Sequence, residues 1–326
     1  MEENSDKPFF LFLSHFAVHD PIEGREDLVH KYDEKLIHLK RQEGDAYVLE
    51  GNPDDHNPLT REYLDGLIDK PEYAEYRIYP EKLVKIKQFQ DNTQFAGMVE
   101  SVDESFGRVL SKLEELGLGE NTIVIFFSDN GGMSAANFWD RERIIPDDKV
   151  DRAYATSNLP LRGGKGWLYE GGIREPMIIR WPGKSQEGTV SDVPVISNDF
   201  FPSILEMLGL DLPPDVKPEG VSIVPLLMGE TKLDREAIYW HFPLYSNHGM
   251  QSPGGAIRAG DYKLLEYFEN NRVQLFNLKS DIGEQYDLSG SEPEKVIEMR
   301  NMLHTWREDI NAQMMLPNPD YQSGTN

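Results

Sequence analysis

Residues 122–132 have the sequence Thr-Ile-Val-Ile-Phe-Phe-Ser-Asp-Asn-Gly-Gly, in which an apolar run passes directly into a polar turn. An apolar run without alternation predicts a strand buried on both faces, over 122–127. Ligands of open α/β sheets bind beyond the carboxyl ends of the strands, where Asp129 and Asn130 follow this one. Their carboxylate and amide oxygens suit Ca²⁺ or Mg²⁺, although Asp-Asn-Gly-Gly is also ordinary turn chemistry.

The segments that flank this run indicate the fold class. Between Asp91 and Leu118 apolar residues recur at steps of three and four, which predicts an amphipathic helix ended by Gly117 and Gly119. A helix that leads into a buried strand is typical of an α/β fold, so we expect a mostly parallel sheet with helices on both faces. The same criteria predict strands over 8–13 and 176–181 and helices over 26–42 and 199–208.

Two other regions differ in composition from this α/β part. Residues 43–80 are acidic and rich in Tyr, Pro and Asn, without a sustained period, which predicts a surface insertion. After the proline-rich residues 212–225, short apolar runs alternate with Gly, Asp and Asn, which predicts an antiparallel meander with one covering helix. We therefore expect an α/β domain over 1–220 and a smaller α+β domain over 221–326. The expected meander strands are 237–240, 256–258, 262–267 and 273–277, and the expected helix is 293–310.

Charge and cysteine content exclude several classes of function. The 326 residues carry 33 Lys and Arg against 57 Asp and Glu, a formal net charge of −24, and no cysteine. An acidic surface repels nucleic acid and anionic membranes, so we expect neither as a partner. Disulfides, thiolate zinc sites and cysteine nucleophiles are excluded within these residues. The sequence has no apolar run of membrane-spanning length, and its first residues have no basic signal-peptide region.

A second polar segment follows the predicted strand 8–13. It reads His-Phe-Ala-Val-His-Asp-Pro at residues 15–21. Two histidines four residues apart could bind zinc on a helix, but Pro21 opposes a helix and the H-E-x-x-H pattern is absent. A histidine here could instead donate to an oxyanion, or simply pack against the fold.

A third segment, residues 160–176, is rich in glycine around Lys165. Glycines let backbone amides approach an anion while the ammonium supplies charge, so this loop could contact a phosphate or sulfate, although the segment taken by itself fits a turn with a solvated lysine better. It is not a Walker A loop, because Gly166 stands where Ser or Thr must follow the lysine. Residues 139–174 carry a net charge of +1, so the general negative charge is relieved around Lys165.

Together these segments resemble the type I, formylglycine-dependent sulfatases of the alkaline-phosphatase superfamily. The resemblance runs from Lys7 to Tyr321 and rests most on the 122–132 and 160–176 segments, in this order and spacing. The carboxyl-terminal part resembles the small domain of bacterial sulfatases that act on sulfated polysaccharides. The resemblance implies an incomplete alkaline-phosphatase-like α/β domain, a smaller α+β domain, and hydrolysis of sulfate esters.

The resemblance also implies roles for four residues. Asp129 and Asn130 correspond to two ligands of the active-site Ca²⁺, and His19 and Lys165 to residues that bind the sulfate and steady its departing oxygen. The family's nucleophile is a formylglycine made from Cys or Ser in a C/S-x-P-S/A-R motif, which these residues lack. We expect this motif upstream of Phe9, and we expect weak Ca²⁺ binding, unpaired strand edges and no turnover by this chain alone.

Because the nucleophile motif is absent from these residues, three functional alternatives are open. The chain is expected to be the carboxyl-terminal part of an active sulfatase, with the amino-terminal half as partner. Alternatively, it is a non-catalytic split or degenerate half that binds sulfated glycan or a partner chain. A phosphatase or phosphodiesterase relative fits less well, because those sites usually need more metal ligands.

The substrate and the location are expectations from the same resemblance. Aromatic faces stack on sugar rings and arginine pairs with sulfate, which makes six residues candidates for a sugar pocket. The family's polysaccharide-degrading members are usually exported, so we expect a periplasmic or extracellular protein. The pocket candidates are Trp139, Arg141, Arg143, Trp167, Tyr169 and His241.

Overall fold

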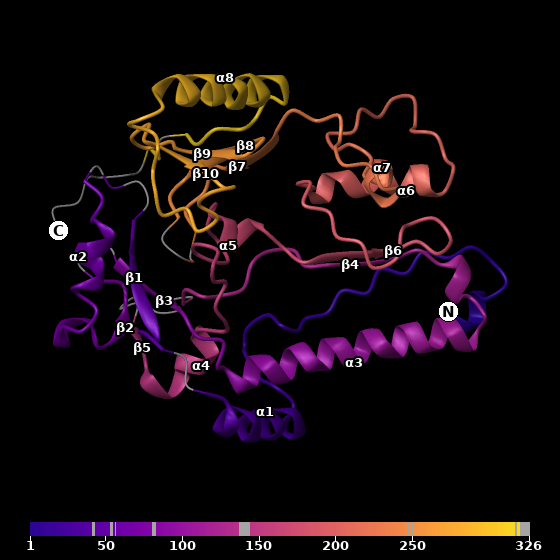
Figure 1. The fold of residues 1–326 in the computed structure, drawn as a ribbon, viewed down its shortest axis with the longest axis horizontal. Coiled ribbons are helices and arrows are strands. Elements are labelled where there is room, and N and C mark those ends of the chain that lie inside the picture. Colours follow the sequence, from indigo (N-terminus) through magenta and orange to yellow (C-terminus); the bar gives the residue numbers. More distant parts are fainter. Residues whose placement is uncertain are drawn as a thin grey trace.

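The computed structural model describes residues 1–40, 43–52, 55, 57–79, 83–136, 144–246, 248, 251–316 and 318–319. At the centre of one half lie two strands, β4 (Val124–Phe127) and β6 (Met177–Arg180), between two helices, α3 (Thr93–Glu115) and α6 (Phe200–Met207) (Figure 1). The Phe106 ring contacts Phe126 on one face, and the Phe200 ring contacts Phe127 on the other. This confirms the helices predicted over 91–118 and 199–208 and the strands predicted over 122–127 and 176–181.

The pairing of β4 differs from the expected mostly parallel sheet. β4 pairs with β6 in antiparallel register, with Val124 opposite Arg180 and Phe127 opposite Met177. All strand pairs within the described ranges are antiparallel. A parallel pair needs a further strand that returns through a crossover, and the described residues provide β4 with no such neighbour.

The run at residues 8–13 is not a strand, so this prediction is wrong. The Phe10 and Phe12 side chains are 80% and 79% exposed, and no strand pairs with the segment. An apolar run forms a strand only where a partner accepts its backbone hydrogen bonds. The amino-terminal segment instead runs beside α3 (Figure 1), where Glu2 pairs with Lys112 at 3.1 Å.

The described residues between 43 and 87 form a packed unit, where the sequence predicted a surface insertion over 43–80. The antiparallel strands β1 (Tyr47–Gly51) and β3 (Leu83–Lys87) lie beside the short helix α2 (Arg61–Asp65). Strand β2 (Tyr76–Arg77) pairs with β5 (Ile144–Ile145). Leucine and tyrosine side chains from across the unit share its core, which explains why no local period shows in the sequence. They are Leu49, Leu64, Leu67, Tyr73, Tyr79 and Leu83.

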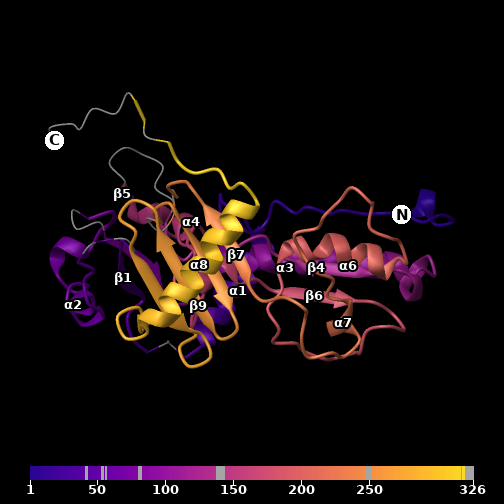
Figure 2. The ribbon, with the colours of Figure 1, turned by 90° about the horizontal axis from the view of Figure 1, so that it is seen from above.

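The carboxyl-terminal part confirms the predicted meander and its helix. Strands β7 (Ile238–Phe242), β8 (Gly254–Ala259), β9 (Tyr262–Tyr267) and β10 (Val273–Asn277) pair in sequence order. Helix α8 (Pro293–Asp309) lies across one face (Figure 2), where Met299 and Leu303 are buried with Leu264 and Leu275. The opposite face packs on Trp167, Leu168 and Tyr169, so the core of the sheet extends to residues upstream of 220.

The remaining elements are short, apart from helix α1 (Glu26–His38). Helix α1 packs on α3, and it ends earlier than the predicted 26–42 segment. No helix within the described ranges is long and apolar enough to cross a bilayer. These elements are α1 (Glu26–His38), α4 (Val150–Ala153), α5 (Glu170–Ile173), α7 (Val224–Leu227) and 3₁₀ turns at Glu2–Asn4, Pro71–Tyr73, Gly119–Asn121, Asp147–Lys149 and Ser197–Asp199.

A buried ion cluster fastens α5 to the carboxyl-terminal sheet. The Lys263 ammonium, on β9, lies 3.0 Å from the Glu170 carboxylate and 2.9 Å from that of Glu284. The Glu170 N–H also donates to the Glu284 carboxylate at 2.7 Å. All three side chains are almost completely buried, so each charge depends on the others for compensation.

Glycines let the turn after β4 lie directly against residues 162–172. A Cβ on Gly131 would lie 1.8 Å from the Gly171 carbonyl oxygen. A Cβ on Gly164 would lie 2.6 Å from the Gly132 carbonyl oxygen. Both separations are shorter than any real contact, so this backbone packing requires glycine.

Replacing Gly131 with alanine should therefore separate the two segments. We expect Gly131→Ala to lower the free energy of unfolding by about 1–3 kcal/mol, since the obstructing atom is backbone and cannot rotate away. Gly107 is the matched control: it lies within α3 with nothing near its added Cβ. Gly107→Ala should be neutral or stabilise by up to about 1 kcal/mol in urea unfolding. Equal stability of both variants would contradict this packing.

Candidate functional site

The His19 and Lys165 side chains meet although 146 residues separate them. His19 Nε2 lies 2.8 Å from Lys165 Nζ. On the other side of the ring, Nδ1 lies 2.8 Å from the Asp20 carboxylate and 2.9 Å from its carbonyl oxygen. Both neighbours of Nδ1 are acceptors, so this nitrogen carries the proton. His19 Nε2 is thereby directed at the lysine ammonium.

Two backbone hydrogen bonds bring Lys165 to the end of β4. The Lys165 N–H donates to the Gly132 carbonyl at 3.1 Å, and the Gly131 N–H donates to the Gly172 carbonyl at 3.1 Å. Gly163 and Gly166, on either side of the lysine, have φ values of 71° and 88°. L side chains rarely adopt this conformation, which explains the glycines. All three polar segments found in the sequence thus converge on one place.

The candidate oxygen ligands Asp129 and Asn130 lie on the turn after β4. Asp129 is exposed, and Asn130 donates from its Nδ2 to the Gly131 carbonyl at 3.0 Å, while its Oδ1 has no hydrogen-bond partner among the described residues. Glu175 Oε1 is buried and accepts no hydrogen bond from the described residues. Burial, and then the charge of Asp129, raises the pKa of Glu175 to about 8.

This donor set fits a hard cation but does not complete its shell. The buried Glu175 carboxyl oxygen has no hydrogen-bond partner among the described residues, and the negative charge of Asp129 acts on it. A divalent cation bound here would supply the missing contact and compensate the negative charge. Calcium takes six to eight oxygen ligands. The described ranges contain no group of three or more His, Cys, Asp or Glu residues that could hold a metal alone.

The structure describes three of the six proposed sugar-pocket residues. Trp167 is 2% exposed and packs with Tyr169 in the core, so neither side chain presents a face to a sugar. His241, on β7, is half-buried, and its Nε2 bonds the Gln313 carbonyl at 2.7 Å. Trp139, Arg141 and Arg143 lie outside the described residues.

Asp20, Glu175 and His248 at the site were not predicted from the sequence. Asp20 directly follows His19, so its role in orienting the imidazole was open to inference from adjacency alone. His248 lies in the loop between β7 and β8, more than 80 residues from Lys165 in the sequence. The charges of Lys165, Asp20 and His19 all act on its imidazole. Only the packing of that loop on Gly166 reveals the proximity.

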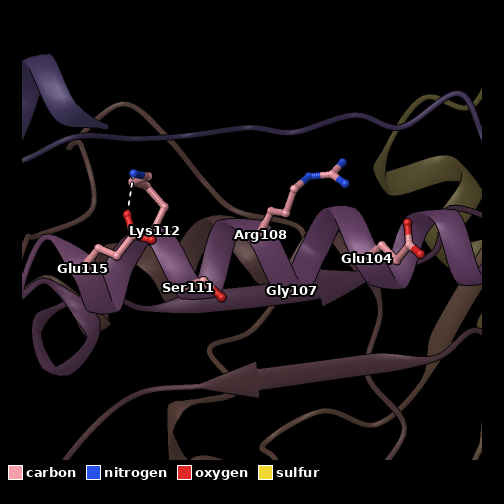
Figure 3. A pocket seen from close by; sticks show the side chains of 6 residues that line it. All are labelled: Glu104, Gly107, Arg108, Ser111, Lys112 and Glu115. Atoms are coloured by element: carbon pink, nitrogen blue, oxygen red, sulfur yellow. Dashed lines mark hydrogen bonds and ion pairs between the residues drawn. The ribbon is translucent and has the colours of Figure 1, made fainter.

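A separate groove on the surface of α3 offers no comparable chemistry. Figure 3 shows its side chains along one face of the helix, with Lys112 paired to Glu115. None of its residues belongs to the His19 and Lys165 site, and its charges largely neutralise each other. The groove is lined by Glu104, Gly107, Arg108, Ser111, Lys112 and Glu115.

Known proteins share both the sequence and the fold of this chain. Residues 1–210 match the sulfatase family model, and residues 164–312 match the carboxyl-terminal region of N-sulphoglucosamine sulphohydrolase. A sulfatase of Formosa agariphila is 30% identical over 324 residues, which cover 86% of this chain and 55% of that protein. An N-acetylglucosamine-6-O-sulfatase of Bacteroides thetaiotaomicron is 28% identical over 67% of this chain and 36% of its own length.

Solved structures show the same fold. The crystal structure of Ps i-CgsB in complex with k-i-k-neocarrahexaose has a TM-score of 0.65 and 22% identity, covering 94% of this chain and 52% of that one. BT4656 in complex with D-glucosamine-2-N,6-O-disulfate has a TM-score of 0.52 and 21% identity, covering 92% and 60%. The chain therefore has the alkaline-phosphatase-like α/β fold of these sulfatases and spans about half the length of such relatives. By its sequence match over residues 1–210, it belongs to the sulfatase family.

Proposed function

We propose that this chain forms the metal-binding and leaving-group side of a site that hydrolyses sulfate esters of sugars. The observation that carries the proposal is the 2.8 Å contact between His19 Nε2 and Lys165 Nζ, with Nδ1 of the same ring held by Asp20. Both side chains converge on one point beside the end of β4. An anionic sulfate would be drawn to a fixed ammonium in an otherwise acidic chain.

The chemistry follows from where negative charge develops. Cleavage of the ester S–O bond leaves charge on the departing sugar oxygen, and a fixed cationic donor stabilises that charge. Lys165 would donate a hydrogen bond to this oxygen, while Asp20 keeps His19 Nε2 directed at the same place. His19 Nε2, which accepts from the Lys165 ammonium, would keep Nζ directed at the leaving oxygen.

Calcium would be held by the Asp129 carboxylate and the Asn130 side-chain oxygen, close to Glu175. When bound, the ion would supply positive charge to orient the sulfate and the nucleophile. The family's formylglycine motif is absent from this sequence. We therefore propose that the chain binds sulfate esters but does not complete their turnover alone.

We propose sulfated sugars as the substrate class because similar proteins are named for such substrates or hold them in their structures. One is named an N-acetylglucosamine-6-O-sulfatase, and one solved structure holds D-glucosamine-2-N,6-O-disulfate. Enzymes that degrade large sulfated polysaccharides meet them outside the cytoplasm, so we also propose a periplasmic or extracellular location.

A second proposed function is that of a non-catalytic half that binds a partner chain. The exposed segment with Phe10, Phe12 and Phe16, together with the open two-stranded β4–β6 sheet, favours this alternative. Exposed apolar chain next to unpaired strand edges is a surface on which strands of another polypeptide can add. The amino-terminal half of a sulfatase is the partner proposed for it.

Sulfate binding tests the first function. We expect isothermal titration calorimetry to detect inorganic sulfate binding, and Lys165→Met to weaken it roughly 10- to 100-fold, since a charge-assisted hydrogen bond is lost. Lys184→Met, at an exposed lysine, should bind like the unchanged chain. The chain alone should release no 4-nitrophenol from 4-nitrophenyl sulfate. Measurable turnover would refute the proposed inactivity, and unaltered binding by Lys165→Met would refute the site.

Calcium should stabilise the chain through Asp129. With a dissociation constant of about 1 mM, typical of a shell short of ligands, about 10 mM Ca²⁺ would add about 1.4 kcal/mol of stability. Asp129→Asn should abolish this gain in thermal unfolding, whereas Asp192→Asn, in an exposed loop, should retain it. A gain that survives in Asp129→Asn would place the ion elsewhere.

The exposed apolar segment that contains Phe10 and Phe12 should make the chain self-associate. We expect the chain to associate at micromolar concentration in sedimentation velocity, and the double change Phe10→Ser with Phe12→Ser to shift it toward monomer. Val190 is a matched control, since it is 92% exposed but lies away from this segment in the sequence. Val190→Ser should associate like the unchanged chain; a monomeric unchanged chain would argue against an adhesive surface.

A further inference from the structure

The loop between β7 and β8 reaches the lysine at its neighbour Gly166. A Cβ on Gly166 would lie 2.5 Å from Ser246 Oγ and 2.6 Å from the Cβ of His248. Only a glycine permits this approach, and its φ of 88° also favours glycine. The Ser246 and His248 side chains therefore lie directly against the backbone of Gly166, the residue that follows Lys165.

Hydrogen bonds fix this loop to the lysine segment. The almost completely buried Gln251 accepts the Leu168 N–H at 3.1 Å and donates to the Ser252 carbonyl at 2.6 Å. The His248 N–H donates to Ser246 Oγ at 3.0 Å, and the Ser246 N–H donates to the Gln251 carbonyl at 3.0 Å. His248 is thus held by the same contacts that place Leu168, three residues after Lys165.

The His248 imidazole has an unused polar atom. Its Nδ1 is buried and has no hydrogen-bond partner among the described residues. Burial lowers the pKa of His248, and the Lys165 and His19 charges lower it further while Asp20 opposes them. The ring is therefore neutral near pH 7. A buried polar atom without a partner is costly, which favours a ligand that supplies the missing hydrogen bond.

A neutral imidazole suits a hydroxyl group better than a sulfate. One ring nitrogen donates and the other accepts, and a sugar hydroxyl can satisfy either. A sulfate oxygen can only accept a hydrogen bond, and the Lys165 ammonium already supplies a donor for it. Two neighbouring groups, one cationic and one neutral, match a ligand that carries a sulfate beside free hydroxyls.

We propose that His248 determines specificity by contacting a hydroxyl of the sugar ring whose sulfate lies at His19 and Lys165. This inference rests on the proposed sulfate ester function and adds the residue that distinguishes a sulfated sugar from sulfate alone. It assigns the β7–β8 loop, from the carboxyl-terminal sheet, a direct part in substrate selection.

The test compares binding of inorganic sulfate with that of N-acetylglucosamine 6-sulfate and galactose 4-sulfate by calorimetry. At least one sugar sulfate should bind the unchanged chain more tightly than inorganic sulfate. His248→Ala should weaken its binding about tenfold and leave inorganic sulfate within twofold. His248→Gln, which keeps a donor and an acceptor, should recover part of the loss. His30→Ala, at an exposed histidine of α1, is the control.

Failure of this inference can be distinguished from failure of the proposed function. If inorganic sulfate binds but neither sugar sulfate binds more tightly, or if His248→Ala weakens sulfate and sugar equally, the role of His248 is refuted and the sulfate site stands. If the unchanged chain binds none of the three, the proposed function fails and the inference fails with it. The His248 ring ¹⁵N shifts should also move with a sugar sulfate and not with inorganic sulfate.

Discussion

The hydrogen bond from the Lys165 N–H to the Gly132 carbonyl joins the two halves of the candidate site. One half is the turn after β4, with the proposed oxygen ligands Asp129 and Asn130. The other is the loop that carries the lysine. Backbones can approach this closely only where no Cβ intervenes, so the site depends on the glycines on both sides. Electrostatics then acts on groups whose positions the backbone has already fixed.

The charged groups around this contact fall into two kinds with different consequences. Glu170, Lys263 and Glu284 are buried and ion-paired through Lys263, so they hold the loop to the carboxyl-terminal sheet without facing solvent. His19 and Lys165 are at least partly accessible, and Glu175 has an oxygen without a partner. Groups of the first kind maintain geometry, and groups of the second kind remain available for a ligand.

The sequence allowed prediction of elements that are regular over their whole length. Helix α3 shows an apolar period over more than five turns, and the meander strands are separated by clear turn residues, so local pattern sufficed. The run at 8–13 failed because a strand needs a partner, which no local pattern reports. The unit over 43–87 was missed because its core residues, such as Leu49 and Leu83, meet only through tertiary contacts.

The residues of the candidate site also divide into those with a local sequence signal and those that meet only through tertiary contacts. Asp129, Asn130 and Lys165 were proposed as site residues because they stand at recognisable turns, and the family resemblance joined His19 to them. The resemblance could not place Trp167, which is an aromatic residue beside the lysine and yet a core residue. His248 carries no local signature at all. Its relation to Lys165 arises from the contact of two loops that are distant in the sequence.

The ion cluster around Lys263 also links ligand binding at Lys165 to the cooperative unfolding of the carboxyl-terminal sheet. Because α5 begins five residues after Lys165 and is fastened to β9 by buried charges, the lysine loop cannot open without exposing those charges. Local fluctuation at the site is thereby suppressed, and the loop and the carboxyl-terminal sheet act as one folding unit. An anion held by Lys165 would consequently stabilise this whole unit by mass action, far beyond the residues that it touches.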